Sequence, residues 1–217
     1  MASPLLLRFF SLTQTIVFRT IGNKIPTKAA KPVTDIGFII FEKMGVKFPA
    51  IADVYLKFYE NVVRDETKLA NITPSDRVLV IGSGSLPATP ILINKLSGAS
   101  IVTIDRDHKA VKKCTDYLHR NHLDTHITVA EGEGLTYPAN DFTVIFLMYG
   151  VKNTQAVLDS LPRRTQNACR VVIRLMSDLN HQNVDNLDLT THFIVKNQVH
   201  TTTLGSFDTF LLEKKQA

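Results

Sequence analysis

A glycine-rich hexapeptide near the middle of the chain has the composition of a nucleoside-binding turn. It directly follows the apolar run 77–81 and consists of Gly82, Ser83, Gly84, Ser85, Leu86 and Pro87. Glycines permit a tight turn and let the backbone approach a ligand closely. A proline suits the first turn of a helix, and the free amides at a helix start can donate to a polar ligand. We therefore expect these six residues to hold a cofactor.

Asp105 ends the second predicted strand, and Arg106 follows it. In a strand, glycine loop, helix and strand unit, a carboxylate at this place accepts hydrogen bonds from ribose hydroxyls. Pro87 stands where dinucleotide-binding loops carry a third glycine. The pattern indicates a nucleoside without a pyrophosphate, held by the loop together with Asp105 and Arg106. The alternative is a fold that has kept the loop but lost its ligand, and Asp107 is expected to cap the next helix.

Alternating elements from residue 77 onward predict the scaffold that positions this loop. Apolar runs predict strands buried on both faces, separated by helical patterns. We expect strands at 77–81, 100–104, 126–129, 142–148, 170–175, 191–200 and 207–213, with helices at 87–96, 107–121 and 152–161. The last two strands lack a crossover helix between them, so an antiparallel strand is expected there. The sequence thus predicts an α/β protein with a Rossmann-like, doubly wound, mostly parallel sheet and an antiparallel terminal strand.

A helical segment precedes this sheet. We divide the chain into an N-terminal helical segment, 1–70, which would be a lid or contact a membrane or partner, and a Rossmann-like domain, 71–217. Helical patterns are expected at about 35–45 and at 50–70. In the second of these helices the apolar positions near one face are Ile51, Val54, Phe58, Val62 and Leu69.

The N-terminal residues 1–34 account for the net charge of the chain. The net charge is +5, and this segment contains no acid and the basic residues Arg8, Arg19, Lys24, Lys28 and Lys31. The rest of the chain is therefore neutral. Nucleic-acid binding would require a basic surface on the folded domain, so no nucleic-acid partner is expected.

Within this segment, residues 5–21 have the pattern of an amphipathic helix with a wide apolar face. Its two arginines and its shortness argue against a transmembrane span. Three roles stay open: packing on the catalytic domain or a partner subunit, peripheral contact with a membrane surface, and mitochondrial-type targeting. We expect a cytoplasmic protein, with membrane association through residues 5–21 and homo-oligomerisation left open.

The run 78–93, VLVIGSGSLPATPILI, closely resembles the cofactor loop of nicotianamine synthases and related archaeal proteins. The telling part is Gly-Ser-Gly-x-Leu-Pro-x-Thr at 82–89, and the stretch 144–151, VIFLMYGV, is similar to the fourth strand and following loop of that family. The resemblance covers about residues 55–175. It implies a class I S-adenosylmethionine-dependent methyltransferase-like fold with S-adenosylmethionine as the group donor.

The resemblance leaves the reaction open. Methyltransferases release S-adenosylhomocysteine, whereas the synthases transfer an aminocarboxypropyl group to an amine and release methylthioadenosine. Val80 stands where many methyltransferases carry an acid, which favours the synthase-like branch. The chain is shorter than those synthases, however, so we rank methyl transfer to a small or lipophilic acceptor first and aminocarboxypropyl transfer second. A non-catalytic cofactor-binding or scaffold protein is the third alternative.

Further site residues follow from the resemblance and from the predicted elements. The pair Gly132-Glu133 resembles the Gly-Asp pair that serves the adenine in class I methyltransferases, and the alternative is a turn with solvent-facing acids. A general base, if the reaction needs one, would be Tyr149 after the fourth strand, or Tyr59 or Glu60 on the 50–70 helix. The alternatives are a rim aromatic for Tyr149 and an ordinary helix surface for the other two.

The cysteines and histidines show no metal-binding pattern. Cys114 and Cys169 lie far apart and are expected to be buried small hydrophobes, with a single disulfide left open. His119 and His122 share a helix face at a spacing compatible with metal, but no carboxylate or thiol completes a site. We therefore expect no metal. The acceptor is expected to be a small molecule.

Overall fold

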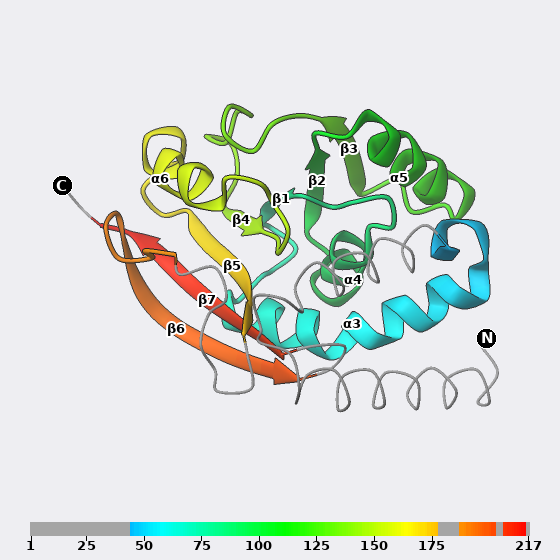
Figure 1. The fold of residues 1–217 in the computed structure, drawn as a ribbon, viewed down its shortest axis with the longest axis horizontal. Helices are drawn as coiled ribbons and strands as arrows, with labels where there is room; N and C mark the ends of the chain where they lie inside the picture. The colour runs from blue at the N-terminus through cyan, green and yellow to red at the C-terminus, as the bar shows by residue number, and fades with distance from the viewer. Residues whose placement is uncertain (1–43, 178–186, 203–205, 216–217) are drawn as a thin grey trace, which may run out of the picture.

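The computed structural model describes residues 44–177, 187–202 and 206–215. In this part of the chain one sheet has the strand order β3-β2-β1-β4-β5-β7-β6 (Figure 1). The strands are β1 (Arg77–Ile81), β2 (Ser100–Asp105), β3 (Ile127–Glu131), β4 (Val144–Leu147), β5 (Arg170–Ser177), β6 (Phe193–Thr202) and β7 (Ser206–Lys214). The helices are α3 (Pro49–Leu69), α4 (Ala88–Ser97), α5 (His108–Arg120) and α6 (Thr154–Arg164).

The strand directions confirm the predicted fold class. β1 to β5 are parallel to one another, whereas β7 is antiparallel to both β5 and β6. The sheet is therefore mostly parallel, with an antiparallel hairpin at one end. The predicted 142–148 strand is shorter in the structure, because the ladder with β1 runs only over Val144 to Leu147.

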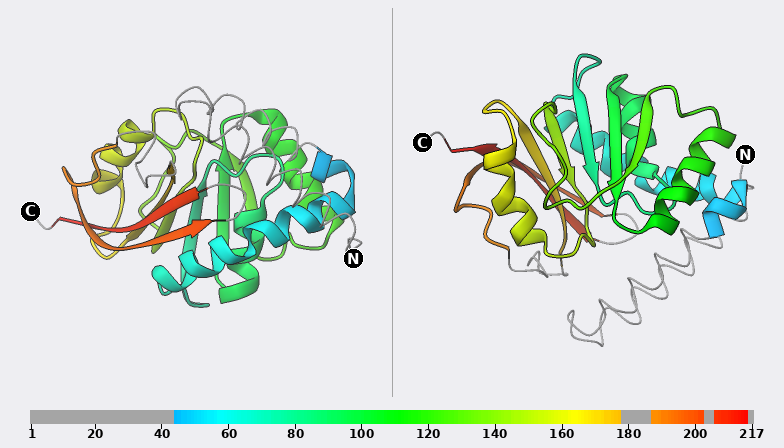
Figure 2. Two further views of the ribbon diagram at one scale, coloured as in Figure 1. Left: turned by 60° about the horizontal axis from the view of Figure 1, so that its bottom comes forward. Right: turned by 90° about the horizontal axis from the view of Figure 1, so that it is seen from above.

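The two faces of the sheet are covered by different helices (Figure 2). Alternate residues of β1 point to opposite sides: Val78 and Val80 pack in the core with α3, α4 and α5, while Leu79 and Ile81 pack in the core with α6. Burial on both faces explains why β1 is a continuous apolar run. The prediction that both cysteines are buried is confirmed, and they are free thiols.

Helix α3 runs beside α4 and reaches the β6–β7 hairpin (Figure 1). Its extent matches the predicted 50–70 helix, but the apolar positions near one face are not all buried. Val54 and Val62 are buried, whereas Ile51, Phe58 and Leu69 are partly exposed. The helix is instead rotated so that its single fully buried acid, Glu66, faces the sheet.

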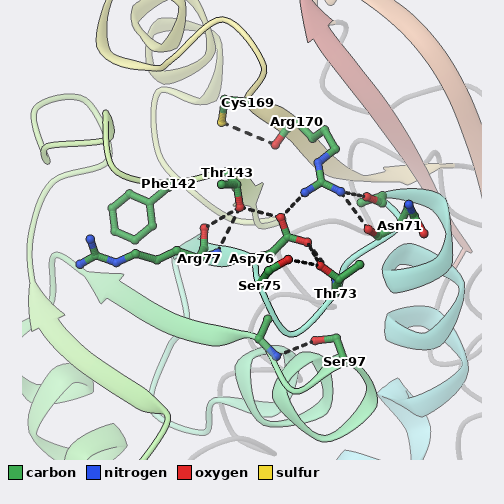
Figure 3. A network of polar contacts seen from close by, with 12 residues as sticks. Asn71, Thr73, Ser75, Asp76, Arg77, Ser97, Phe142, Thr143, Cys169 and Arg170 are labelled. Atoms are coloured by element: carbon green, nitrogen blue, oxygen red, sulfur yellow. Dashed lines mark hydrogen bonds and ion pairs between the residues drawn. The ribbon is translucent and has the colours of Figure 1, made fainter.

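A buried acid ties together the amino edge of the sheet, where the parallel strands begin (Figure 3). Asp76, just before β1, accepts hydrogen bonds from the Thr73 amide at 2.8 Å and the Thr143 hydroxyl at 2.7 Å. It also forms an ion pair with Arg170. Burial alone would raise the pKa of Asp76, but the hydrogen bonds from both threonines and the neighbouring guanidinium hold that pKa below its ordinary value of 3.8.

Arg170, at the start of β5, has both of its terminal nitrogens engaged (Figure 3). Nη1 donates to the carbonyls of Ala70 at 2.5 Å and Asn71 at 2.9 Å, and Nη2 donates to Asp76. These carbonyls belong to the C-terminal end of α3, where helical carbonyls lack partners within the helix. The network therefore joins the end of α3 to β1 and β5.

Two predicted features of the N-terminal segment, the amphipathic helix at 5–21 and most of the helix at about 35–45, lie outside the described residues. Among the helices that the structure does describe, none is both long and apolar enough to cross a membrane.

Candidate functional site

A cavity of about 520 Å³ opens at the carboxyl edge of the sheet, beyond the ends of β1, β2 and β4. This edge is where ligands bind in doubly wound sheets, and the volume lies within the usual range for small-molecule sites. The walls come from the loops after β1, β2, β3 and β4, from the start of α4 and from α3, β5 and β7. The cavity thus combines the predicted glycine loop with elements that the loop motif does not include.

The loop after β1 needs its glycines. Gly82 has φ of +88° and Gly84 has φ of +66°, both in the left-handed region that glycine adopts most easily. A Cβ atom at Gly82 would lie 2.6 Å from Cγ2 of Val151, so the β4 loop packs directly against this glycine. Glycine at this position therefore lets the two cavity loops meet.

Asp105 holds the loop in place from the end of β2. One carboxylate oxygen accepts from the Gly84 amide at 2.9 Å, and the other accepts from the Asp107 amide at 3.0 Å. Each carboxylate oxygen has two lone pairs, so the group retains the capacity to accept from a ligand hydroxyl. Asp107 caps α5 as predicted, because its side chain accepts from the Lys109 amide at 2.9 Å.

Ser83 provides an independent indication that the loop faces a polar ligand. Its Oγ atom is buried and has no hydrogen-bond partner among the described residues, and Ser83 lines the cavity. Leaving a buried polar group without a partner costs about 1–3 kcal/mol. Together with the carboxylate of Asp105, this hydroxyl fits the sugar and the polar groups of a nucleoside.

Gly132 and Glu133 lie beside Asp105 at the ends of neighbouring strands. The Gly132 amide donates to the Asp105 carbonyl at 3.0 Å, and a Cβ on Gly132 would lie 2.6 Å from Cδ2 of Tyr137. Glu133 forms an ion pair with Arg106 at 3.9 Å, and both side chains are exposed at the cavity wall. The structure therefore brings the ribose and adenine candidates together at one end of the cavity.

The other end of the cavity contains aromatic residues. Tyr59 of α3 lines it, and so does Tyr149 of the loop after β4, whose ring contacts Phe207 of β7 at 6.3 Å between centroids. Glu60 does not line the cavity, and its carboxylate lies 2.5 Å from Nη2 of Arg64. Of the predicted cofactor residues, only Ser85 and Pro87 are absent from the lining. Pro87 is the N-cap of α4 and not a residue of its first turn.

A buried ion pair at this end was missed by sequence reasoning. Arg174 of β5 lines the cavity and donates to both carboxylate oxygens of Glu66 on α3, from Nε at 2.7 Å and from Nη2 at 2.5 Å. Nη2 also lies 3.3 Å from the hydroxyl of Thr89, the last residue of the 82–89 motif. The sequence contained one signal for it, because Arg174 interrupts the apolar run 171–176 of β5.

No protein-family model matches the chain. Over 123 residues, 56% of the chain, it is 25% identical to the L-histidine 2-aminobutanoyltransferase of Yersinia pestis. The chain spans 46% of the length of that curated relative.

Solved structures show the fold. The chain is similar to a mutant of the nicotianamine synthase MtNAS in complex with S-adenosylmethionine, with a TM-score of 0.70 at 16% identity over 81% of this chain and 71% of that one. MtNAS in complex with MTA and tNA gives a TM-score of 0.69 at 15% identity, over 82% of this chain and 70% of that one. An RNA methyltransferase from Salinibacter ruber in complex with S-adenosyl-L-homocysteine gives a TM-score of 0.58 at 18% identity, over 72% of this chain and 93% of that one. The chain thus has an S-adenosylmethionine-dependent methyltransferase-like fold, as the loop resemblance implied.

Proposed function

We propose that this protein is an S-adenosylmethionine-dependent transferase that moves the aminocarboxypropyl group to an amine of an amino-acid acceptor and releases methylthioadenosine. The observation that carries the choice of reaction is the sequence match to a 2-aminobutanoyltransferase. The likeness to MtNAS, extending over 82% of this chain, supports the same choice.

This proposal reverses the order expected from the sequence, where methyl transfer came first because the chain is shorter than nicotianamine synthases. The likeness to MtNAS covers more of this chain than the likeness to the RNA methyltransferase, 82% against 72%. We give this wider likeness and the sequence match to the 2-aminobutanoyltransferase more weight than the shorter chain.

In the proposed reaction, the donor's adenosine lies at the end of the cavity formed by β1, β2 and β3. Asp105 accepts from the ribose hydroxyls, Glu133 accepts from the adenine amino group, and the orphaned Ser83 hydroxyl gains a partner. The rest of the donor would then lie toward the loop after β4 and toward β5, where Tyr149 and Tyr59 line the cavity and could face the sulfonium.

The chemistry is a substitution at carbon. The acceptor nitrogen forms a bond to the carbon of the aminocarboxypropyl group that is attached to sulfur. The bond between that carbon and sulfur breaks with its electron pair going to sulfur, and the new ammonium loses a proton. Holding the nitrogen in line with that bond supplies much of the rate enhancement. Tyr59 and Tyr149 are the candidate groups that orient the acceptor or accept its proton.

The test is product identification. Purified protein is incubated with S-adenosylmethionine and each of the common amino acids, and the nucleoside product and the modified acceptor are identified by mass spectrometry. Methylthioadenosine above the uncatalysed background, matched by an aminocarboxypropyl adduct of one amino acid, supports the proposal. S-adenosylhomocysteine with a methylated acceptor would replace it with methyl transfer.

A substitution tests whether this cavity is the donor site. Asp105→Asn replaces one accepting oxygen by a donor, so we expect the KM for S-adenosylmethionine to rise about 10- to 100-fold. The matched control is Asp116→Asn on α5, whose carboxylate only pairs with Lys112 at the surface. The control should leave the KM unchanged, and an unchanged KM for Asp105→Asn would place the donor elsewhere.

A further inference from the structure

The cavity extends well beyond the part that an adenosine would fill. Asp105 ends β2, whereas Arg174 belongs to β5, and the strand order places β1 and β4 between them. Neighbouring strands lie about 4.8 Å apart, so three steps across the sheet separate these residues by roughly 14 Å. An adenosine with its ribose at Asp105 and its adenine toward Glu133 leaves the β5 end of the cavity open.

Arg174 presents an unusual donor at that end. Its side chain is 2% exposed, and Nε and Nη2 are taken by Glu66, with Nη2 also near Thr89. Among the described residues, Nη1 has no hydrogen-bond partner, and Arg174 lines the cavity. Nη1 is not one of the described side-chain atoms that are both buried and unpaired, so it is open to the cavity and can donate to a ligand atom there.

The guanidinium is held in a fixed position. Glu66 is itself fully buried and accepts from the Thr209 hydroxyl of β7 at 2.8 Å, so its carboxylate is fixed from two strands. The Tyr59 ring covers the guanidinium, with 5.5 Å between the ring centroid and Cζ. Burial alone would lower the pKa of Arg174, but the carboxylate of Glu66 holds that pKa above its ordinary value, so the donor stays charged.

We propose that Arg174, fixed by Glu66, forms a subsite at the α3–β5 end of the cavity for the α-amino carboxylate of a ligand. Nη1 donates to the ligand carboxylate. Glu66 cancels the net charge of the arginine, so the subsite suits a zwitterionic amino-acid group better than a bare anion. The 82–89 motif gains a role for its last residue, because Thr89 contacts the same guanidinium nitrogen that Glu66 holds.

Two ligands of the proposed reaction carry this group, and the inference rests on the proposed function to that extent. One is S-adenosylmethionine, whose aminocarboxypropyl tail would lie toward β5 if its adenosine is held at Asp105 and Glu133. The other is the amino-acid acceptor. The experiment must therefore separate the donor's carboxylate from the acceptor's.

The test variant is Glu66→Leu/Arg174→Met, which replaces both charges by apolar side chains of similar size and leaves neither charge buried alone. The matched control is Asp76→Leu/Arg170→Met at the amino edge of the same sheet, which removes an ion pair away from the cavity. Circular dichroism and thermal unfolding establish that each variant is folded. Calorimetry then gives the Kd of S-adenosylmethionine and of methylthioadenosine, which lacks the amino carboxylate.

Three results are distinguishable for the folded test variant. If Arg174 binds the donor, the Kd of S-adenosylmethionine rises about 10- to 100-fold while that of methylthioadenosine changes less than about twofold. If Arg174 binds the acceptor, both Kd values hold and the KM of the acceptor rises by a similar factor. The subsite is refuted if none of the three constants changes, or if both nucleosides weaken equally.

The result is also independent of which group is transferred. A wild-type protein that binds S-adenosylmethionine but yields S-adenosylhomocysteine would overturn the proposed aminocarboxypropyl transfer and leave the donor arm of this test intact. The control variant should match wild type in both Kd values. A control that weakens S-adenosylmethionine selectively would refute the assignment to Arg174.

Discussion

The two edges of the sheet are built from the same kinds of residues and differ in what those residues leave unsatisfied. At the amino edge, Arg170 pairs with Asp76, and its other terminal nitrogen donates to two backbone carbonyls (Figure 3). At the carboxyl edge, Arg174 pairs with Glu66 and has an open nitrogen on the cavity wall. Both arginines belong to β5 and occupy the same face of it, since strand residues alternate.

The difference shows where ligand binding can be inferred. An arginine whose terminal nitrogens are all bonded to protein holds elements together, and the amino edge joins α3, β1 and β5 in this way. An arginine with a terminal nitrogen open to a cavity can instead donate to a ligand that enters the cavity. The same comparison applies to a hydroxyl, because the Thr143 hydroxyl at the amino edge is bonded and the Ser83 hydroxyl at the carboxyl edge is not.

The largest expected effect is on stability, from removing one acid of each pair. Glu66→Leu leaves Arg174 as an uncompensated charge in a fully buried position, so we expect a loss of about 3–5 kcal/mol in the free energy of unfolding. Asp76→Leu should cost less, about 1.5–3 kcal/mol, because Arg170 is 23% exposed and keeps its two carbonyl partners. Urea unfolding measures both values.

The double substitution Glu66→Leu/Arg174→Met tests whether the unpaired charge of Arg174 causes this loss of stability. Removing both charges should recover most of the stability lost by Glu66→Leu, since the cost arises from the unpaired guanidinium and not from the missing carboxylate. If the double variant is as unstable as the single one, the pair stabilises the fold in its own right. The larger loss of stability for Glu66→Leu than for Asp76→Leu would then not result from the deeper burial of Arg174.

Sequence patterns located cavity residues at the β1–β3 end and missed those at the β5 end. The glycine loop follows the apolar run 78–81 and Asp105 ends β2, so local patterns locate them. Glu66 and Arg174 lie 108 positions apart, and only the packing of α3 on the sheet brings them together. The same contact explains why the apolar positions of α3 are not all buried, because Glu66 turns toward β5 and leaves Phe58 and Leu69 partly exposed.

The next largest effect is expected from alanine substitutions of two glycines, one at each edge of the sheet. Gly82 at the carboxyl edge and Gly98 at the end of α4 both have positive φ, +88° and +74°. Alanine at either position strains the backbone by about 1–2 kcal/mol. At Gly98 the new Cβ would meet Pro74 at an ordinary 3.5 Å, whereas at Gly82 it would meet Val151 at 2.6 Å.

We therefore expect Gly82→Ala to cost about 2–4 kcal/mol of stability and to raise the Kd of S-adenosylmethionine at least tenfold. Gly98→Ala should lose only about 1–2 kcal/mol and keep the Kd. Thermal unfolding and calorimetry on the two variants provide these values. Equal Kd values for both variants would mean that the loop of Gly82 does not contact the ligand.

The smallest effect is the pH dependence that Asp76 gives the amino edge. The pKa of Asp76 in the folded protein lies below its ordinary value of 3.8. Its ionised carboxylate therefore stabilises the fold above about pH 3.8, and this contribution is lost as the pH falls through the folded pKa. The stability difference between wild type and Asp76→Asn should stay constant above about pH 5 and shrink progressively below about pH 4.

Matched threonine substitutions locate this pH dependence at one edge. Thr143→Val removes a 2.7 Å hydrogen bond that lowers the pKa of Asp76, so the acid-induced loss of stability should become smaller. Thr209→Val removes a 2.8 Å hydrogen bond of the same kind from Glu66 at the other edge and should leave the Asp76 contribution unchanged. Urea unfolding between about pH 3 and about pH 6 distinguishes the two. If Thr209→Val changed the acid-induced loss as much as Thr143→Val does, the two edges would be coupled, and Arg174 could not be treated as an independent ligand-binding group.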